Sequence, residues 1–269
     1  MTDEPSPYLH GHHDSVLQSH RWRTAANSCG YLLDHLRPGM TLLDVGCGPG
    51  TITVDLAAAV APGEVVAVDR AAGILAEAQA TAAAGGVGTV SFEVADVLAL
   101  PYADGRFDVV HAHQVLQHLA DPVAALREMR RVCRPGGVVA ARDGDYGGFL
   151  WTPPDPVLDQ WRDLYVAVAR AIGGDPLGGR RLLAWARQAG FTDIRASAST
   201  WVYATSNERQ WWGRSWADRA TRSAFADAAR SHGLATDAEL AAIADAWRRW
   251  AESDTGWIVI PSGEILCRA

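Results

Sequence analysis

The sequence of 269 residues is long enough for one large domain, or for one domain that carries an inserted cap. Apolar residues make up 48% of the chain, which is enough for a sizeable hydrophobic core. The net charge of −7 is spread along the chain, so nothing attracts the protein electrostatically to nucleic acid or to an anionic membrane.

The sequence gives no sign of export, membrane insertion or a metal site. Segment 1–14 lacks a basic start followed by an apolar run, and no stretch reaches the roughly 18 apolar residues of a membrane helix. The four cysteines are scattered without the spacing of metal ligands. We therefore expect a cytoplasmic protein without a bound metal.

Strands and helices alternate between residues 41 and 143. Short apolar runs, typical of strands buried on both faces, lie at 41–46, 64–69, 89–96, 107–113 and 137–143. Helices are expected at 51–61, 71–84 and 122–134, the last capped by Asp121 and ended by Pro135-Gly136-Gly137. Such repeated strand–helix units predict a parallel, doubly wound α/β sheet.

The pattern changes after residue 150. Helices are expected at 161–172, 180–189 and 208–251, a strand at 191–204, and a pair of final strands within 256–269. We therefore predict a single domain. Its parts are an N-terminal helical segment (1–39), a Rossmann-like core (40–206 and 255–269) and an inserted helical lid (207–254).

The first predicted strand runs into a glycine-rich loop. Gly46, Gly48 and Gly50 alternate with other residues, so the backbone can turn tightly and approach a ligand without a Cβ in the way. The helix that begins at Thr51 points its free N–H groups at this loop, which favours an anionic group such as a carboxylate. A plain glycine-rich turn is the alternative explanation.

Acidic residues close the first three strands. Asp69 can accept hydrogen bonds from both hydroxyls of a ribose, and Asp96 can accept one from an adenine amine that Val97 contacts. Each acid alone could be a helix cap, but three such acids, Asp44 included, are harder to explain that way. A dinucleotide site fits less well, because Thr51 stands where its third glycine belongs.

Residues 40–143 resemble the class I S-adenosylmethionine-dependent methyltransferases, especially the branch of the ubiquinone/menaquinone biosynthesis methyltransferases. The matching segments are LLDVGCGPGT, VVAVDR, FEVADVLALPYADGRFDVVHAHQVLQHLADP and LREMRRVCRPGG. The resemblance implies a Rossmann-like, seven-stranded, mostly parallel sheet with helices on both faces and an antiparallel last strand. It also implies S-adenosylmethionine as cofactor and S-adenosylhomocysteine as product.

The same resemblance implies which residues hold the cofactor. The three glycines would cradle its amino-acid half, Asp69 would bind the ribose with Arg70 beside the adenine, and His113 would lie near the reactive methyl. The expected set is Asp44, Gly46, Cys47, Gly48, Gly50, Thr51, Asp69, Arg70, Ala95, Asp96, Val97 and His113.

Methyl transfer is an in-line displacement that mainly requires alignment of the reactants and exclusion of water. A general base is needed only where the nucleophile must lose a proton. The candidate catalytic residues are His113, Asp143 and Asp145. Turn formation explains the two acids equally well, and His118 fits a structural role better than a catalytic one.

The N-terminal segment is expected to form a helix over the cofactor, although a plain surface helix is the alternative. Tyr8 or Trp22 could then face the sulfonium as a cation–π partner, and His20 or Arg23 could meet the carboxylate. A metal site at His10, His12 and His13 is disfavoured, because nothing elsewhere completes it.

Ten of the eleven tryptophans follow residue 150, and several fall on the predicted lid. Packing of the lid explains most of them. Trp211 and Trp216, together with Tyr146, are our candidates for an apolar substrate pocket.

We therefore predict methyl transfer to an oxygen, carbon or nitrogen of a small, largely apolar or aromatic metabolite, in secondary metabolism. A homodimer is kept as one option for the assembly. The first alternative is an RNA or protein methyltransferase, which the acidic charge and the absence of an Asn-Pro-Pro-Tyr or Asp-Pro-Pro-Tyr loop disfavour. The second is a non-catalytic protein that binds S-adenosylmethionine.

Overall fold

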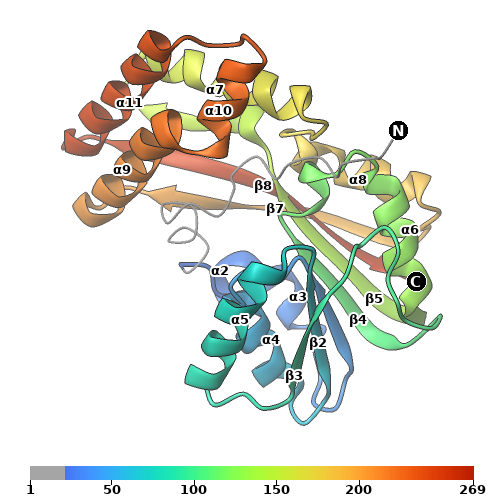
Figure 1. Cartoon of the computed structure of the whole chain (residues 1–269). Coiled ribbons are helices and arrows are strands. Elements are labelled where there is room, and N and C mark those ends of the chain that lie inside the picture. Colours follow the sequence, from blue (N-terminus) through green and yellow to red (C-terminus); the bar gives the residue numbers. More distant parts are fainter. Residues whose placement is uncertain (1–21) are drawn as a thin grey trace.

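The computed structural model describes residues 22–269, which fold around one twisted sheet with helices on both faces (Figure 1). The strands are β1 (Leu42–Val45), β2 (Val65–Asp69), β3 (Val90–Val94), β4 (Phe107–His113), β5 (Cys133–Gly144), β6 (Leu150–Thr152), β7 (Ile194–Tyr203) and β8 (Trp257–Arg268). β3, β2, β1, β4 and β5 are parallel neighbours in that order, and β8 pairs antiparallel with β5. β7 lies on the other side of β8.

The sheet has eight strands, where the sequence predicts seven. The additional strand, β6, is only three residues long and pairs with the first residues of β8, beyond the stretch that pairs with β5. A run this short carries no periodicity from which it could be recognised.

The predicted pair of final strands is wrong, because β8 is one continuous strand of 12 residues. Pro261 and Gly263 do not interrupt it. Pro261 falls at the gap between the residues of β8 that pair with β5 and those that pair with β6. A residue without an N–H group is tolerated where a strand lacks a neighbour.

The helices of the Rossmann-like core lie on the two faces of the sheet (Figure 1). They are α2 (Ala25–Ser28), α3 (Gly30–Leu33), α4 (Thr51–Val60), α5 (Ala72–Ala84), α6 (Pro122–Val132) and α8 (Gly178–Gln188). α6 begins as the sequence predicts, since Asp121 Oδ1 accepts a hydrogen bond of 2.8 Å from the Ala124 N–H.

Side chains of β4 and β5 alternate between two apolar layers. Val110, Ala112 and Val139 pack with α6 and α8, whereas Val109 and Ala140 pack with α2, α3 and α4. The alternation places three polar side chains, His111, His113 and Arg142, on the second face.

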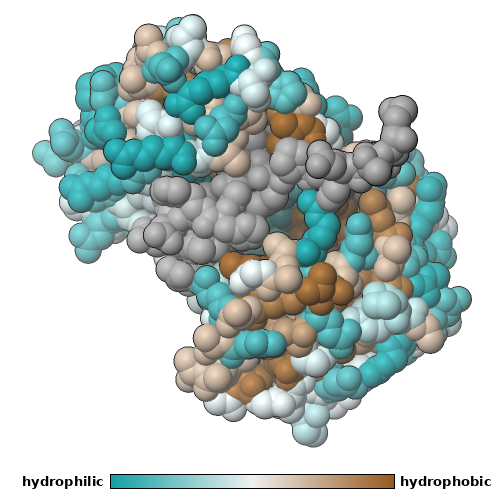
Figure 2. Space-filling model, viewed as in Figure 1, coloured by the Kyte–Doolittle hydropathy of each residue, from teal (hydrophilic) through white to brown (hydrophobic). Residues whose placement is uncertain are grey.

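Four helices gather at one end of β7 and β8 (Figure 1). They are α7 (Pro156–Ala171), α9 (Ser206–Arg222), α10 (Ala224–Ser231) and α11 (Asp237–Glu252). α9, α10 and α11 form the insertion between β7 and β8. Figure 2 shows that the outer surface of this end is mainly hydrophilic. Within the described chain, no helix is both long and apolar enough to cross a membrane.

Candidate active site

The glycine-rich loop joins β1 to α4. Gly46, Gly48 and Gly50 all have positive φ, at 68°, 53° and 80°, which residues with a Cβ rarely adopt. A Cβ on Gly46 would also collide with the Val115 side chain, and one on Gly50 would lie 3.1 Å from the Ala78 backbone. The loop therefore needs glycine both for its conformation and for close packing.

Asp69 connects this loop to the next helix. Its Oδ2 accepts a hydrogen bond of 3.1 Å from the Gly48 N–H, and its Oδ1 accepts one of 2.9 Å from the Ala71 N–H. These two hydrogen bonds and a ribose contact are compatible, because a carboxylate has about four acceptor sites. Contact of Asp69 with a ribose stays a prediction.

The residues after β3 lie next to Asp69. The Ala95 N–H donates a hydrogen bond of 3.3 Å to the Asp69 carbonyl. Asp96 is exposed and its Oδ1 accepts a hydrogen bond from the Leu98 N–H, whereas Val97 is buried. Together with the exposed Arg70, these side chains lie at the same edge of the sheet as the glycines.

Asp44 faces into the protein. It is 3% exposed, its Oδ2 accepts a hydrogen bond of 2.6 Å from Thr53, and its Oδ1 lies 2.8 Å from His111 Nδ1. Asp44 therefore links β1, which leads into the glycine loop, to α4 and β4. A direct contact of Asp44 with the cofactor stays a prediction.

His111 is a site residue that sequence reasoning missed. Burial opposes its protonation, but the hydrogen bond and charge of Asp44, with a contribution from Cys29, raise the pKa of His111 to about 10. Asp44 and His111 are register partners on the parallel strands β1 and β4. Their pairing was thus the signal that could have found His111.

Cys47 and Thr51 complete the predicted cofactor set. Cys47 is buried in the glycine loop, and this burial raises the pKa of its thiol well above the usual range. Thr51 is the first residue of α4, whose N-terminus therefore adjoins the loop. This is the arrangement that favours an anionic group.

His113 ends β4 beside a tryptophan that sequence reasoning also missed. The His113 ring lies 5.8 Å from the Trp201 ring, and His113 pairs in register with Arg142. The next residue, Gln114, has a φ of 54°, an uncommon conformation for a residue with a side chain. Its Oε1 accepts a hydrogen bond of 2.9 Å from Arg23 Nη2.

The two candidate acids at the end of β5 differ in their surroundings. Asp145 forms two hydrogen bonds with Arg180, of 2.5 and 2.8 Å, which commit its carboxylate to an ion pair. Asp143 is fully buried and none of its described neighbours bonds its oxygens. Burial raises the pKa of Asp143 to about 7, although the nearby backbone N–H groups of Gln117 and Val115 oppose the shift.

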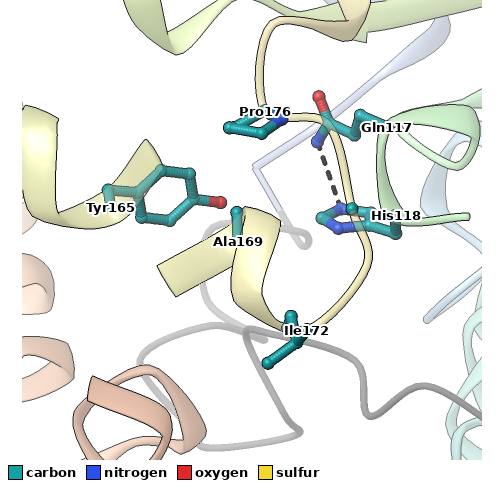
Figure 3. Close-up of a pocket in the computed structure, with 7 residues that line it drawn as sticks. Gln117, His118, Tyr165, Ala169, Ile172 and Pro176 are labelled. Atoms are coloured by element: carbon teal, nitrogen blue, oxygen red, sulfur yellow. Dashed lines mark hydrogen bonds between the residues drawn. The ribbon is translucent and has the colours of Figure 1, made fainter. Parts of the chain in front are cut away.

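His118 lines the small cavity in Figure 3, between α7 and the segment that follows β4. The cavity has a volume of about 10 Å³, the size of about one water molecule. The Gln117 side-chain amide donates a hydrogen bond of 3.1 Å to the His118 ring. Burial and the charge of Arg23 lower the pKa of His118 to about 4. These surroundings favour the structural role.

The aromatic candidates for the substrate pocket belong to one hydrophobic cluster and form a partly buried group and a fully buried group within it. Trp22 packs against Trp201 at 5.5 Å and against Trp211 at 6.2 Å, and both Trp22 and Trp211 are partly buried. Trp216 is fully buried among other aromatic rings, and Tyr146 stacks on Tyr165 at 3.8 Å. Only the first group lies near His113. The calls on Tyr8, His10, His12, His13 and His20 lie outside the described residues.

Comparison with known proteins identifies the family. A family model for the methyltransferase domain matches residues 36–175. An uncharacterised methyltransferase of Schizosaccharomyces pombe is 34% identical, with 96% of this chain and 95% of the relative covered. A demethylmenaquinone methyltransferase of Parafrankia sp. is 35% identical, with 67% and 76% covered. The crystal structure of the YcgJ protein of Bacillus subtilis shares the fold at a TM-score of 0.57 and 19% identity, with 88% and 96% covered.

The chain belongs to the methyltransferase family and is an S-adenosylmethionine-dependent methyltransferase. Its relatives include the menaquinone-pathway enzymes, as the sequence resemblance predicts. We expect the glycine loop, Asp69 at the end of β2 and Asp96 after β3 to hold S-adenosylmethionine, as the sequence resemblance implies. The bound cofactor would supply an activated methyl group on a sulfonium.

The glycine loop can be tested against a glycine outside the site. Gly46→Ala should lower the affinity for S-adenosylhomocysteine at least tenfold, or by about 1.4 kcal/mol, because the new Cβ pushes on Val115. Gly86→Ala is the matched control, since Gly86 has a φ of 66° but open space around a Cβ. Titration calorimetry measures both affinities. Equal affinities in the two folded variants would contradict a cofactor role for the loop.

Proposed function

We propose that this methyltransferase acts on a small metabolite with an aromatic or apolar frame, bound beside His113 and Trp201. The observation that carries the proposal is the group of aromatic rings there. Trp22 and Trp211 extend it from Trp201 toward the helical insertion. Aromatic side chains offer large apolar contact at low entropic cost. The demethylmenaquinone methyltransferase among the relatives is consistent with a small-molecule substrate.

We also propose that α9, α10 and α11 act as a lid over this substrate. Trp211 on α9 lies 5.3 Å from Tyr203 on β7, so the insertion contacts the same aromatic group. A lid would exclude water while the nucleophile, methyl and sulfur align. In this proposal His113 is close to the reacting atoms. Asp143 lies on the opposite face of β5, beside α8, and is not the proton acceptor for them.

The substrate class is tested with a labelled methyl donor. The enzyme is incubated with labelled S-adenosylmethionine and a panel of phenolic and terpenoid metabolites, with transfer RNA, or with mixed protein. We expect label in the small molecules. Preferential labelling of RNA or protein would overturn this proposal, and the absence of any transfer would favour a non-catalytic role.

Asp69 gives a separate test of the cofactor site. Asp69→Ala should weaken the binding of S-adenosylhomocysteine by about 1.5–3 kcal/mol for each charged hydrogen bond that the ribose loses. Asp121→Ala is the matched control, because it removes a helix-capping acid at α6. Calorimetry on both folded variants decides the matter. An unchanged affinity in Asp69→Ala would remove this residue from the site.

We further propose a cytoplasmic location and a role in secondary metabolism. All four cysteines are free thiols, which is consistent with a reducing compartment. Fractionation of cells should recover the protein with cytoplasmic markers, and a strain without the gene should grow normally. A homodimer remains one option for the assembly, and the mass measured by light scattering tests it.

A further inference from the structure

We propose that Arg142 binds a carboxylate on the substrate, so that the enzyme methylates small aromatic or apolar carboxylic acids. The inference rests on the proposed function and adds the chemical class of the substrate. It starts from a guanidinium whose two outer nitrogens form no hydrogen bond with any residue of the described range 22–269.

Arg142 lies near the carboxyl end of β5 and is fully buried. Its Nε donates a hydrogen bond of 3.1 Å to Ser199 Oγ and lies 3.5 Å from Glu264 Oε1. Its Nη1 and Nη2 are buried and form no hydrogen bond with any described residue. Leaving buried charged donors unpaired is costly, so such groups in a native protein call for a ligand or for water.

Glu264 does not satisfy these two nitrogens. Its Oε2 accepts a hydrogen bond of 2.7 Å from Ser197, and its Oε1 accepts one of 2.5 Å from Ser199. Ser197 and Ser199 therefore hold the Glu264 carboxylate on the Nε side of Arg142. The result is a fixed guanidinium whose Nη edge is left for another group.

A second guanidinium lies close to this edge. The Arg142 guanidinium lies 4.4 Å from the centre of the Trp201 ring, and that of Arg23 lies 5.4 Å from the same ring. Both guanidinium groups thus lie against the same indole ring. Burial and the charge of Arg23 lower the pKa of Arg142 to about 10, against the effect of Glu264, so Arg142 stays charged at neutral pH.

Two hydroxyl groups are available to the same ligand. Tyr31 Oη and Ser262 Oγ are buried and have no hydrogen-bond partner among the described residues. Ser262 is two residues from Glu264 on β8 and so lies on the same face of the sheet. The charge of Arg142 also acts on the Tyr31 hydroxyl, whose pKa burial raises well above its usual range.

The position of Arg142 suits a substrate anchor. Arg142 is the register partner of His113, and Trp201 packs against both side chains. A carboxylate accepts two parallel hydrogen bonds from a guanidinium, which fixes its orientation as well as its position. The apolar body of an acid held in this way would lie against Trp201 and Trp22.

Matched pairs of charged and uncharged probes test the proposal on the full chain. Formate, acetate and benzoate are titrated at constant ionic strength against formamide, acetamide and benzamide, with S-adenosylhomocysteine saturating. The thermal midpoint of unfolding is the readout. We expect each carboxylate that fits to bind about 10- to 100-fold more tightly than its amide. Formate is small enough to fit any site that accepts a carboxylate. Equal shifts of the thermal midpoint by the acid and the amide in every pair would therefore overturn the proposal.

Variants then assign the preference to one side chain. Arg142→Met should remove the preference for carboxylates. Arg142→Lys should reduce it, because an ammonium group cannot form the bidentate pair of hydrogen bonds with a carboxylate. Arg195→Met is the control, since Arg195 is exposed on β7. A preference that persists in Arg142→Met overturns the assignment. If that variant does not fold, the lysine variant and the wild-type pairs decide the question.

The same samples separate this inference from the proposed function. Calorimetry with S-adenosylhomocysteine alone measures the cofactor site. Normal cofactor binding without any carboxylate preference overturns only the Arg142 anchor. Failure to bind the cofactor overturns the proposed function, and the carboxylate titration still reports on Arg142. Buried water is the other ligand that could pair with these N–H donors. It would give no preference for carboxylates over their amides.

Discussion

Trp216→Ala is expected to lower the free energy of unfolding by about 3–5 kcal/mol, the usual range for truncating a large aromatic side chain in a core. Trp216 is completely buried, and its ring lies 4.5 Å from Trp161 and 6.2 Å from Trp247. Neither of these neighbours is exposed. Deletion of the indole would therefore leave a cavity that surrounding rings fill only in part.

The matched control is Trp211→Ala on the same helix. Trp211 is partly buried and contacts Trp22 and Tyr203 rather than the centre of the lid. We expect a smaller loss of stability there, together with a loss of substrate turnover. Unfolding by urea measures the stability of both variants. Equal losses of stability would contradict the distinction between a packing tryptophan and a substrate tryptophan.

This distinction changes one expectation from the sequence. Trp216 and Trp211 were equivalent candidates, because both are tryptophans on the predicted lid. The structure places Trp216 at the buried centre of a hydrophobic cluster with α7, α10 and α11, whereas Trp211 lies at the partly buried edge of the same cluster. Sequence periodicity cannot divide tryptophans between a core and a pocket when the helices that pack together are far apart in the chain.

The cofactor side of the fold was largely predictable from local signals. The glycine loop, Asp69 and the cap at Asp121 depend on short-range backbone geometry, which glycine, acids and proline mark directly. The positive φ angles of Gly46, Gly48 and Gly50 agree with that reading. How these residues contact the cofactor stays a prediction.

The substrate side was less predictable because it depends on pairing between distant strands. Arg142, Glu264 and Ser199 come from β5, β8 and β7, and they meet only because β8 runs between the other two. An arginine inside the apolar run of β5 was a visible signal, but its partners were not. The same reason explains Asp145, whose ion pair with Arg180 depends on where α8 begins.

Removal of the Asp44–His111 pair should produce a loss of stability that depends on pH. Asp44→Asn leaves His111 buried without its carboxylate, and breaking a buried pair in this way typically costs about 3–5 kcal/mol. Both side chains are nearly inaccessible, so solvent screens the pair little. Asp104→Asn is the matched control, because it breaks an exposed ion pair with Arg131 and should cost at most about 1 kcal/mol.

The sign of the pH dependence follows from the pKa of His111. The folded-state pKa is raised to about 10 from the usual 6.5 of a histidine, so between these values the folded protein holds more protons than the unfolded chain. The contribution of the pair is thus complete below pH 6.5 and is lost as the pH rises through 10. Asp44→Asn should abolish most of that fall, so the difference in stability between wild type and variant narrows from pH 6.5 to 10. Urea unfolding across this range measures the difference, and a constant difference would show that His111 is not ionised by Asp44.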